Sequence, residues 1–446
     1  MDKLITPYDF RIKEVLITSD RFKDKPPLNV TPITFGFEVF EDINISYLTG
    51  TLGLVDDNDL QNIYGFTGTE RVSITVALPG LDQEITNNFI MMSFKDKKRS
   101  GNTDVIYFNL IEEHAFLSNS IEFSKFYDGT AGSIIKKICK DKLNVEVNTS
   151  KAKKNYQPEF RYIVPYQNPL QAASQVLKKA TTENGLPYFF YSTFLDEALC
   201  YKDLETMISE EPFEKFIYSQ AFSSAAISYE PRIRGKAIEK VKLDSNKDTL
   251  LLAQMGVYGS DYSYFDVQTG KSQNTHINVY QVYENLNFQK IFPKGQNQPP
   301  FPKNVLPDNS LKSNKTLDQY DSKYIHQISS STYPFDGGVN NFSEEENDVS
   351  YYSGRVTSES MRQILYHNEI GVRIPGFHFC YGSNRGVGNA LQVDIYKNAP
   401  DVQDELDAEK SGNYIITSKK HTFDTLKNES TVDLGISKIA NLEVTI

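Results

Sequence analysis

The stretch RVSITV, residues 71–76, alternates strictly between polar and apolar residues. Val72, Ile74 and Val76 therefore share one face of a strand, because successive side chains of a strand point to opposite sides. A second stretch, TFGFEVF at residues 34–40, also carries apolar residues at alternate positions. This two-residue period predicts half-buried β-strands rather than helices.

The rest of residues 1–117 continues the pattern in short segments. Further strands are predicted at 50–55, 89–94 and 104–111, and the polar connection at 97–102 predicts a hairpin between the last two. Short strands at this spacing are typical of a sandwich or a barrel. We therefore expect a first β domain over residues 1–117.

Residues 118–220 predict an α+β domain. Apolar residues recur at helical spacing between Ile134 and Leu143, with lysines on the opposite face. A second helix is expected after Asn168, which can cap it, with Pro169 at its first position and Gly185 at its exit. A strand at 186–191 follows.

Strands return in the C-terminal part. They are predicted at 237–243, 250–252, 371–381, 391–396, 413–423 and 430–436, with a helix capped by Thr357 before the last four. We expect a second, discontinuous β domain at 221–255 plus 355–440. Between its two parts, residues 256–354 are rich in Asn, Gln, Ser, Tyr and Pro and predict an inserted, loop-rich domain. The stretch GQNQPP at 295–300 is expected to form no regular element.

The composition excludes several classes of protein. The 446 residues carry 47 basic and 58 acidic side chains, a formal charge of −11, which is unfavourable for gripping nucleic-acid phosphates. The three cysteines are too few and too far apart for a disulfide framework or a CxxC zinc site, and they fit a reducing compartment. The charged N-terminus does not resemble a signal peptide, and no run of about 18 apolar residues predicts a membrane span.

The possible chemical sites each have a simpler structural explanation. His378 and Cys380 could seat a metal, but alternate positions on a strand explain them equally well. Glu112 and Glu113 are adjacent on a predicted strand, so they face opposite sides and cannot form a glycosidase pair together.

Three other features also have a structural interpretation. Cys139 lies on an apolar helix stripe, the glycine-rich loop 382–389 precedes a strand instead of a helix, and the acidic run 56–59 lacks EF-hand spacing. The sequence therefore predicts no catalytic residue, no cofactor-binding residue, no metal ligand and no enzyme activity. A glycosidase pair assembled from distant residues remains an open alternative.

Four patches resemble the central baseplate hub proteins of contractile-tailed bacteriophages, a module shared with type VI secretion spike proteins. The patches are LTGTLGLVD at 48–56 with GTERVSI at 68–74; FYDG at 126–129 with the following helix; YQNPL at 166–170 with its helix; and GFHF at 376–379 with LQV at 391–393 and the strands at 414–423 and 431–434. Their order extends across most of the chain, with 256–354 and 382–389 as departures.

The resemblance implies a mainly β fold with α+β parts. It implies two similar tail-tube-type β-barrel domains, an α+β domain between them and an insertion in the second barrel. It further implies a homotrimer that adapts a sixfold tail tube to a threefold spike, in the baseplate of a virion tail made in the host cytoplasm. Expected partners are the tail tube protein, the central spike protein, other baseplate proteins, the tape-measure protein and DNA in transit.

Two alternatives remain open. One is the hub of a related injection machine or of a non-contractile tail. The other is a tail-associated cell-wall hydrolase or receptor-binding protein, which the Tyr- and Asn-rich segment 256–354 would suit.

Overall fold

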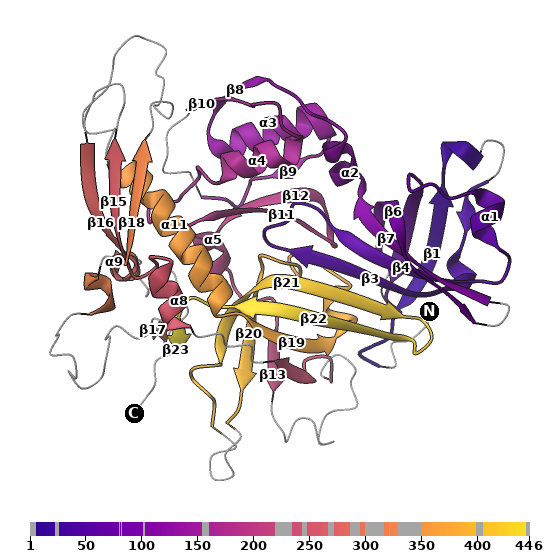
Figure 1. The fold of residues 1–446 in the computed structure, drawn as a ribbon. Coiled ribbons are helices and arrows are strands. Elements are labelled where there is room, and N and C mark those ends of the chain that lie inside the picture. The colour runs from indigo at the N-terminus through magenta and orange to yellow at the C-terminus, as the bar shows by residue number, and fades with distance from the viewer. Residues whose placement is uncertain are drawn as a thin grey trace.

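The fold is seen in a computed structural model of the chain (Figure 1). It describes residues 6–442 except 23–25, 80, 82, 101–102, 154–159, 219–233, 243–247, 266–271, 286–294, 299–315, 321, 329–348 and 398–404. Strands are the main regular structure of the described chain, and most of them pair antiparallel. The prediction of a mainly β protein with α+β parts is confirmed.

Thirteen strands of the described residues form one long sheet. The N-terminal strands are β1 (Arg11–Thr18), β2 (Leu28–Asn29), β3 (Thr34–Asp42), β4 (Thr49–Asp56), β5 (Arg71–Ala77), β6 (Glu84–Ser100) and β7 (Thr103–Glu112). The C-terminal strands are β13 (Lys215–Tyr218), β14 (Lys240–Lys242), β19 (Ile370–Pro375), β20 (Ala390–Ile395), β21 (Gly412–Asp424) and β22 (Glu429–Ser437). We call these the first and the second strand set.

The strand order is open. It runs β14-β19-β22-β21-β3-β4-β7-β6-β5-β1-β2, with β20 and β13 attached beside β21. The ladders between described strands therefore do not close into a barrel, and two separate barrels are not confirmed. The hairpin predicted at 97–102 is tighter than expected, because β6 continues through Ser100 and pairs there with Thr103.

The two sets share one strand order. The first reads β3-β4-β7-β6-β5-β1 and the second reads β14-β19-β22-β21-β20-β13, so each of these strands has a counterpart in the other set, and β2 of the first set has none. A short helical segment follows the second strand of each series: α1 (Leu60–Tyr64) after β4 and η4 (Gly376–Phe379) after β19. The sets differ at one place, since β1 pairs with β5 antiparallel whereas β13 pairs with β20 in parallel.

A register shift also recurs at the same point of both sets. The β6–β7 ladder shifts between Met91 and Ser93, and the β21–β22 ladder shifts between Ile416 and Ser418. The β6–β7 ladder shifts a second time, between Phe94 and Asp96. A β-bulge adds one residue to one strand and bends it locally. Its recurrence on counterpart strands aligns the two sets at this point of the ladder.

An α+β region lies between the two sets in sequence. It contains α2 (Glu113–Asn119), α3 (Ala131–Leu143), α4 (Pro169–Leu177), α5 (Leu204–Ser209), β8 (Phe126–Gly129), β9 (Val147–Asn148), β10 (Phe160–Ile163), β11 (Tyr188–Thr193) and β12 (Asp196–Asp203). Figure 1 shows α3 and α4 side by side above β11 and β12. Asn168 caps α4 as predicted, accepting a hydrogen bond from Gln171 N at 2.8 Å. The helix ends at Leu177, before Gly185, because Thr181 turns back to pair with Pro187.

The segment 256–354 contains more regular structure than expected. The strands β15 (Gly259–Phe265), β16 (Ser272–Asn278) and β18 (Lys323–Ile328) form a small sheet, and α9 (Val279–Asn285) follows β16. In Figure 1 the long helix α11 (Val349–His367) runs from this sheet to the long one. Thr357 lies inside α11, so the predicted cap is wrong.

Two further expectations are corrected. Residues 250–252, predicted as a strand, belong to α8 (Thr249–Gln254), because the Asp248 side chain caps Leu251 N at 2.8 Å. The stretch 295–300 contains β17 (Gln296–Gln298), which pairs with β23 (Asn441–Leu442). Gln296 fits there because its buried side chain donates to Ala440 O at 2.8 Å and to Asn413 O at 3.0 Å.

Candidate assembly interface

The two strand sets meet along one backbone ladder between β3 and β21. The pairing is antiparallel and runs from Ser418 opposite Asp42 to Asp424 opposite Gly36. The first residues of β21 pair with β20, and only its later residues reach β3. This junction makes the two sets one hydrogen-bonded sheet, and Figure 1 shows β3 beside β21.

A fully buried ion pair crosses the junction. Lys419 Nζ of β21 lies 2.5 Å from Glu41 Oε1 of β3, and neither side chain is exposed. The Glu41 carboxylate also accepts hydrogen bonds from Phe194 N at 3.1 Å and Val387 N at 3.3 Å. Buried charges need such partners to offset their loss of water. One carboxylate thus holds β21, the β11–β12 turn and the loop 382–389 to β3.

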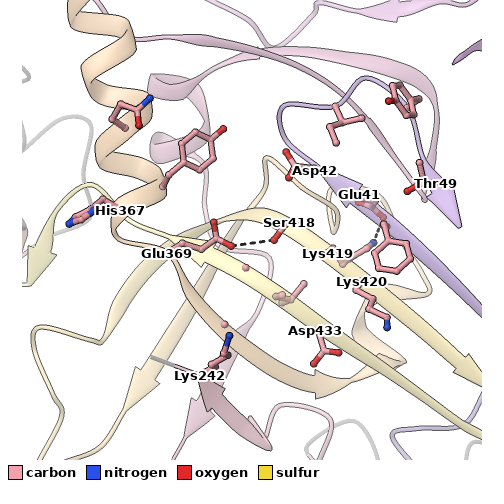
Figure 2. A pocket seen from close by; sticks show the side chains of 18 of the residues that line it. Glu41, Asp42, Thr49, Lys242, His367, Glu369, Ser418, Lys419, Lys420 and Asp433 are labelled. Atoms are coloured by element: carbon pink, nitrogen blue, oxygen red, sulfur yellow. Dashed lines mark hydrogen bonds and ion pairs between the residues drawn. The ribbon is translucent and has the colours of Figure 1, made fainter. Parts of the chain in front are cut away.

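A cleft of about 820 Å³ opens beside the junction. Its acidic, basic and histidine lining residues are Glu41, Asp42, Lys242, His367, Glu369, Lys419, Lys420 and Asp433, and its apolar lining includes Ile45, Leu251 and Met255. Figure 2 shows Glu369 directed at Ser418 and Glu41 directed at Lys419. The cleft therefore combines both signs of charge with an apolar lining.

Glu369 is the perturbed acid of this cleft. Burial raises the pKa of Glu369, the hydroxyls of Ser418 and Thr417 oppose the rise, and the Asp42 charge adds to it. Gly435 leaves room for the carboxyl, since a Cβ there would lie 2.0 Å from Glu369 Oε1. Burial lowers the pKa of His367, which also lines the cleft, and the Asp248 charge opposes this shift.

The structure separates His378 from Cys380. The strand expected at 371–381 ends at Pro375, and both residues follow in or just after η4, so the expected strand alternation is wrong there. His378 Nδ1 lies 3.8 Å from Glu214 Oε2, whereas Cys380 Sγ lies 3.6 Å from His421 Nε2. The two side chains thus face different neighbours and do not form a shared ligand pair.

The Cys380–His421 contact is closed to solvent. Burial raises the pKa of Cys380 to about 12, so the thiol stays protonated. Burial also lowers the pKa of His421 well below its ordinary value, and the neighbouring Lys419 lowers it further. The neutral imidazole lies 2.7 Å from Ser430 Oγ through Nε2. This is a packed polar contact in the core rather than an activated thiol.

The other residues considered from the sequence have separate structural partners. Glu112 accepts hydrogen bonds from Leu48 N at 2.8 Å and Ser192 Oγ at 2.9 Å, whereas Glu113 pairs with Arg71 at 2.7 Å. Cys139 is buried on α3, and burial raises its pKa to about 12.

The glycine-rich loop and the acidic run also serve the fold. The carbonyl of Gly388, in loop 382–389, accepts a hydrogen bond from Lys202 Nζ at 3.0 Å. The carboxylate of Asp56 accepts from Asn58 N at 3.0 Å and Leu60 N at 2.9 Å, which forms the turn before α1.

The GTE motif at 68–70 forms a carboxylate-filled turn. The buried Glu70 carboxylate accepts hydrogen bonds from Thr67 N at 2.7 Å, Gly68 N at 2.8 Å and Thr69 N at 3.1 Å. Burial acts to raise the pKa of Glu70, but the backbone donors outweigh it and hold the pKa below its usual value. Gly68 has φ +91°, which explains the glycine at this position.

We expect Glu70→Gln to lower the free energy of unfolding at pH 7 by about 1–3 kcal/mol, because one of the N–H donors loses its acceptor. A lowered folded pKa stabilises the fold above the unfolded value of 4.5 and is lost as the pH falls through the folded value. Urea unfolding from pH 7 to pH 3 should therefore show a smaller loss of stability for the variant than for the parent chain. Parallel pH profiles would contradict this role.

The residues that hold the junction could not be singled out from the sequence. Glu41 lies in phase with Phe37 and Val39 on the buried face of β3, and Lys419 lies in phase with His421 and Phe423 on β21. The sequence signal for such a residue is a charged side chain at a strand position that faces the core. It identifies a buried charge without identifying its partner.

Two searches of the described residues give further limits. No cluster of three or more His, Cys, Asp or Glu side chains suited to a metal ion is found in the described part of the chain. Within the same ranges, no helix is both long and apolar enough to cross a membrane.

The fold is similar to that of solved tail proteins. The tail protein from Neisseria meningitidis MC58 matches with a TM-score of 0.51 and 11% identity, over 97% of each chain. The 43 kDa tail protein of prophage MuSo2 from Shewanella oneidensis matches with a TM-score of 0.50 and 9% identity, over 95% of this chain and 97% of that chain. A type VI secretion system component of E. coli matches with a TM-score of 0.44 and 10% identity, over 98% of this chain and 80% of that chain.

The first two matches establish the kind of fold. The chain shares the fold of these two tail proteins along nearly its whole length, which confirms the resemblance predicted from the sequence. No family model and no curated protein matches the chain.

Proposed function

We propose that the chain is a structural tail protein, a trimeric baseplate hub that adapts a sixfold tail tube to a threefold central spike. The observation that carries this proposal is the repeated strand order, β3-β4-β7-β6-β5-β1 and β14-β19-β22-β21-β20-β13. Three copies of a chain with two similar strand sets present six sets in a ring. One end of such a ring can match a sixfold tube, while the remaining parts keep threefold symmetry.

The proposed domains follow the sequence boundaries. They are a first β-barrel domain at 1–117, an α+β domain at 118–220, a second β-barrel domain at 221–255 plus 355–440, and an inserted domain at 256–354. Short bridging segments support barrel-like closure of the second domain. Ile238 N donates to Ile217 O of β13 at 2.9 Å, and Glu239 N donates to Arg373 O of β19 at 2.9 Å. One segment therefore contacts β13, at one end of the strand order of the second set, and β19, the neighbour of β14 at the other end.

We also propose the partners that this role requires. They are the tail tube protein, the central spike protein and other baseplate proteins, in a virion tail assembled in the host cytoplasm. The ring would form part of the channel through which tape-measure protein and DNA pass at ejection. The formal charge of −11 suits such a channel, because like charge disfavours DNA adhesion within about one Debye length, 8 Å at physiological salt.

The mass of the purified full-length chain tests this proposal. Light scattering coupled to size exclusion should give three times the monomer mass, and electron micrographs should show a ring with six lobes on one face. A stable monomer at micromolar concentration, or a ring of another order, would contradict the hub. Degradation of purified peptidoglycan by the chain would instead favour the hydrolase alternative.

A further inference from the structure

The junction between the strand sets joins two particular edges. One is the edge of β3 that faces away from β4, and the other is the edge of β21, in its second half, that faces away from β22. The counterpart of β3 in the second set is β14, and the counterpart of β21 in the first set is β6. Each chain therefore contains one junction that is formed, between β3 and β21. It also contains the two equivalent strands, β14 and β6, that could form a second junction of the same kind.

Those counterpart edges lie at the limits of the described sheet. β14 pairs with β19 and ends the strand order. β6 pairs with β5 over residues 84–90, and over residues 93–100 it pairs, among the described strands, with β7. An edge of this kind presents backbone N–H and C=O groups that another strand can pair with.

The shared bulge fixes the register of the second junction on the side of β6. Ser100 pairs with Thr103 at the end of the β6–β7 hairpin, as Asp424 pairs with Glu429 at the end of the β21–β22 hairpin. Counting from the bulge along β7 and β22 reaches these two pairs after the same number of residues, whereas β6 has one extra residue at its second shift, between Phe94 and Asp96. The match of β6 with β21 towards the hairpin therefore holds from Asp96 to Ser100. Ser100 is thus the counterpart of Asp424.

The register on the side of β14 follows through the inner strands. Just after the bulge, Asn109 of β7 pairs with β6 in the first set, and Gly435 of β22 pairs with β21 in the second. On their other sides, Asn109 pairs with Thr51 of β4, and Gly435 pairs with Gly371 of β19. Thr51 lies opposite Glu38 of β3, and Gly371 lies opposite Lys242 of β14.

Glu38 and Lys242 are therefore counterparts. Two residues earlier along each strand, Gly36 and Lys240 are counterparts as well. Since Asp424 lies opposite Gly36 in the formed junction, Ser100 should lie opposite Lys240 in the second one.

We infer that residues 96–100 of β6 pair antiparallel with β14 of a second copy of this chain, with Ser100 opposite Lys240. This inference rests on the proposed assembly of several copies and names the edges through which they meet. The contact is heterologous, because each copy offers a different edge to each neighbour. Repetition of the same step around a ring continues the long sheet from chain to chain and leaves no open edge at these strands.

The sequence of the β6 edge is also compatible with a chain that exists separately before it assembles. Residues 95–99, KDKKR, carry four basic side chains and one acidic one. Lysines on an exposed edge strand oppose unspecific edge-to-edge pairing. We therefore expect this composition to oppose unspecific pairing in the separate chain, while a matched strand in register can still pair with the β6 backbone.

A double-cysteine variant, Ser100→Cys with Lys240→Cys, tests the register in the full-length chain. Residues directly opposite in an antiparallel ladder have Cα atoms about 4.5–5.5 Å apart, which lies within the range of a disulfide. Mild oxidation should convert most of the variant into covalent oligomers, and mass spectrometry should identify the 100–240 bond. The controls are each single variant, the parent chain, and Ser100→Cys with Glu183→Cys, which carries an exposed cysteine outside β14. All four should stay largely uncrosslinked.

The outcomes separate this inference from the proposed function. A trimer of the expected mass whose 100–240 pair does not crosslink, or crosslinks no better than the 100–183 pair, overturns the inferred edges and leaves the hub. A chain that stays monomeric and uncrosslinked at every concentration overturns both. A 100–240 bond in a ring of another order supports the edges and contradicts the trimeric hub.

Discussion

Lys419→Met should lower the free energy of unfolding by about 3–5 kcal/mol, which is the cost of leaving a buried carboxylate without its charged partner. Lys419 and Glu41 have no exposed side-chain surface, so water cannot take the place of the lost ammonium group. Urea unfolding of the variant, followed by circular dichroism at pH 7, measures the effect.

The neighbouring pair provides a matched control. Lys420 Nζ lies 2.7 Å from Glu38 Oε1 across the same two strands, but both side chains are partly exposed. Lys420→Met should therefore cost at most about 1 kcal/mol. Addition of Glu41→Gln to Lys419→Met should recover part of the stability, because Gln keeps an acceptor for Phe194 N or Val387 N without a buried charge. Equal losses for Lys419→Met and Lys420→Met would show that burial of the pair is unimportant.

Phe423→Ala should destabilise the chain by about 3–5 kcal/mol, the usual cost of removing a buried phenylalanine ring. Phe423 belongs to β21 of the second set, yet it packs in the core of the first set. Its ring stacks with Phe37 at 5.8 Å and with His421 at 4.0 Å, and it contacts Phe10 at 5.3 Å. The loss should appear as a lower thermal midpoint of the whole sheet, because one ring connects both sets.

An exposed phenylalanine separates burial from ring chemistry. Phe126 on β8 is 49% exposed, so Phe126→Ala should change stability by well under half as much. If Phe423→Ala unfolds at the temperature of Phe126→Ala, the core of the first set does not depend on the C-terminal strand.

The strands with one buried face could be predicted from the sequence because their side chains alternate in environment. Residues 71–76 and 413–423 were located in this way, and the structure places them in β5 and β21. The sequence pattern does not predict the strands β15, β16 and β18, because their sequence is dominated by Tyr, Ser, Asn and Gln and carries little apolar periodicity. The order of the strands and the junction of β3 with β21 depend on contacts between distant parts of the chain, which no local pattern encodes.

Short apolar runs were the other source of error. Leu250, Leu251 and Leu252 read as a strand or as a helix with equal ease, because three residues are too few to define a period. Asp248, immediately upstream, decides the matter through its side-chain cap. The cap was visible in the sequence and carried more information than the leucines did.

The β3–β21 junction also has a consequence for synthesis. Gly36 pairs with Asp424, so 388 residues of chain must be made between one partner and the other. At roughly 5–20 residues per second, the edge of β3 waits roughly 20–80 s on the ribosome before its partner emerges. During that interval the early strands lack both the ring of Phe423 and the charge of Lys419. An unfinished chain therefore has an unpaired β3 edge next to a core that is not completely packed. We therefore expect the yield of assembled protein to depend in part on how well chaperones prevent aggregation of nascent chains in which β21 has not yet been made.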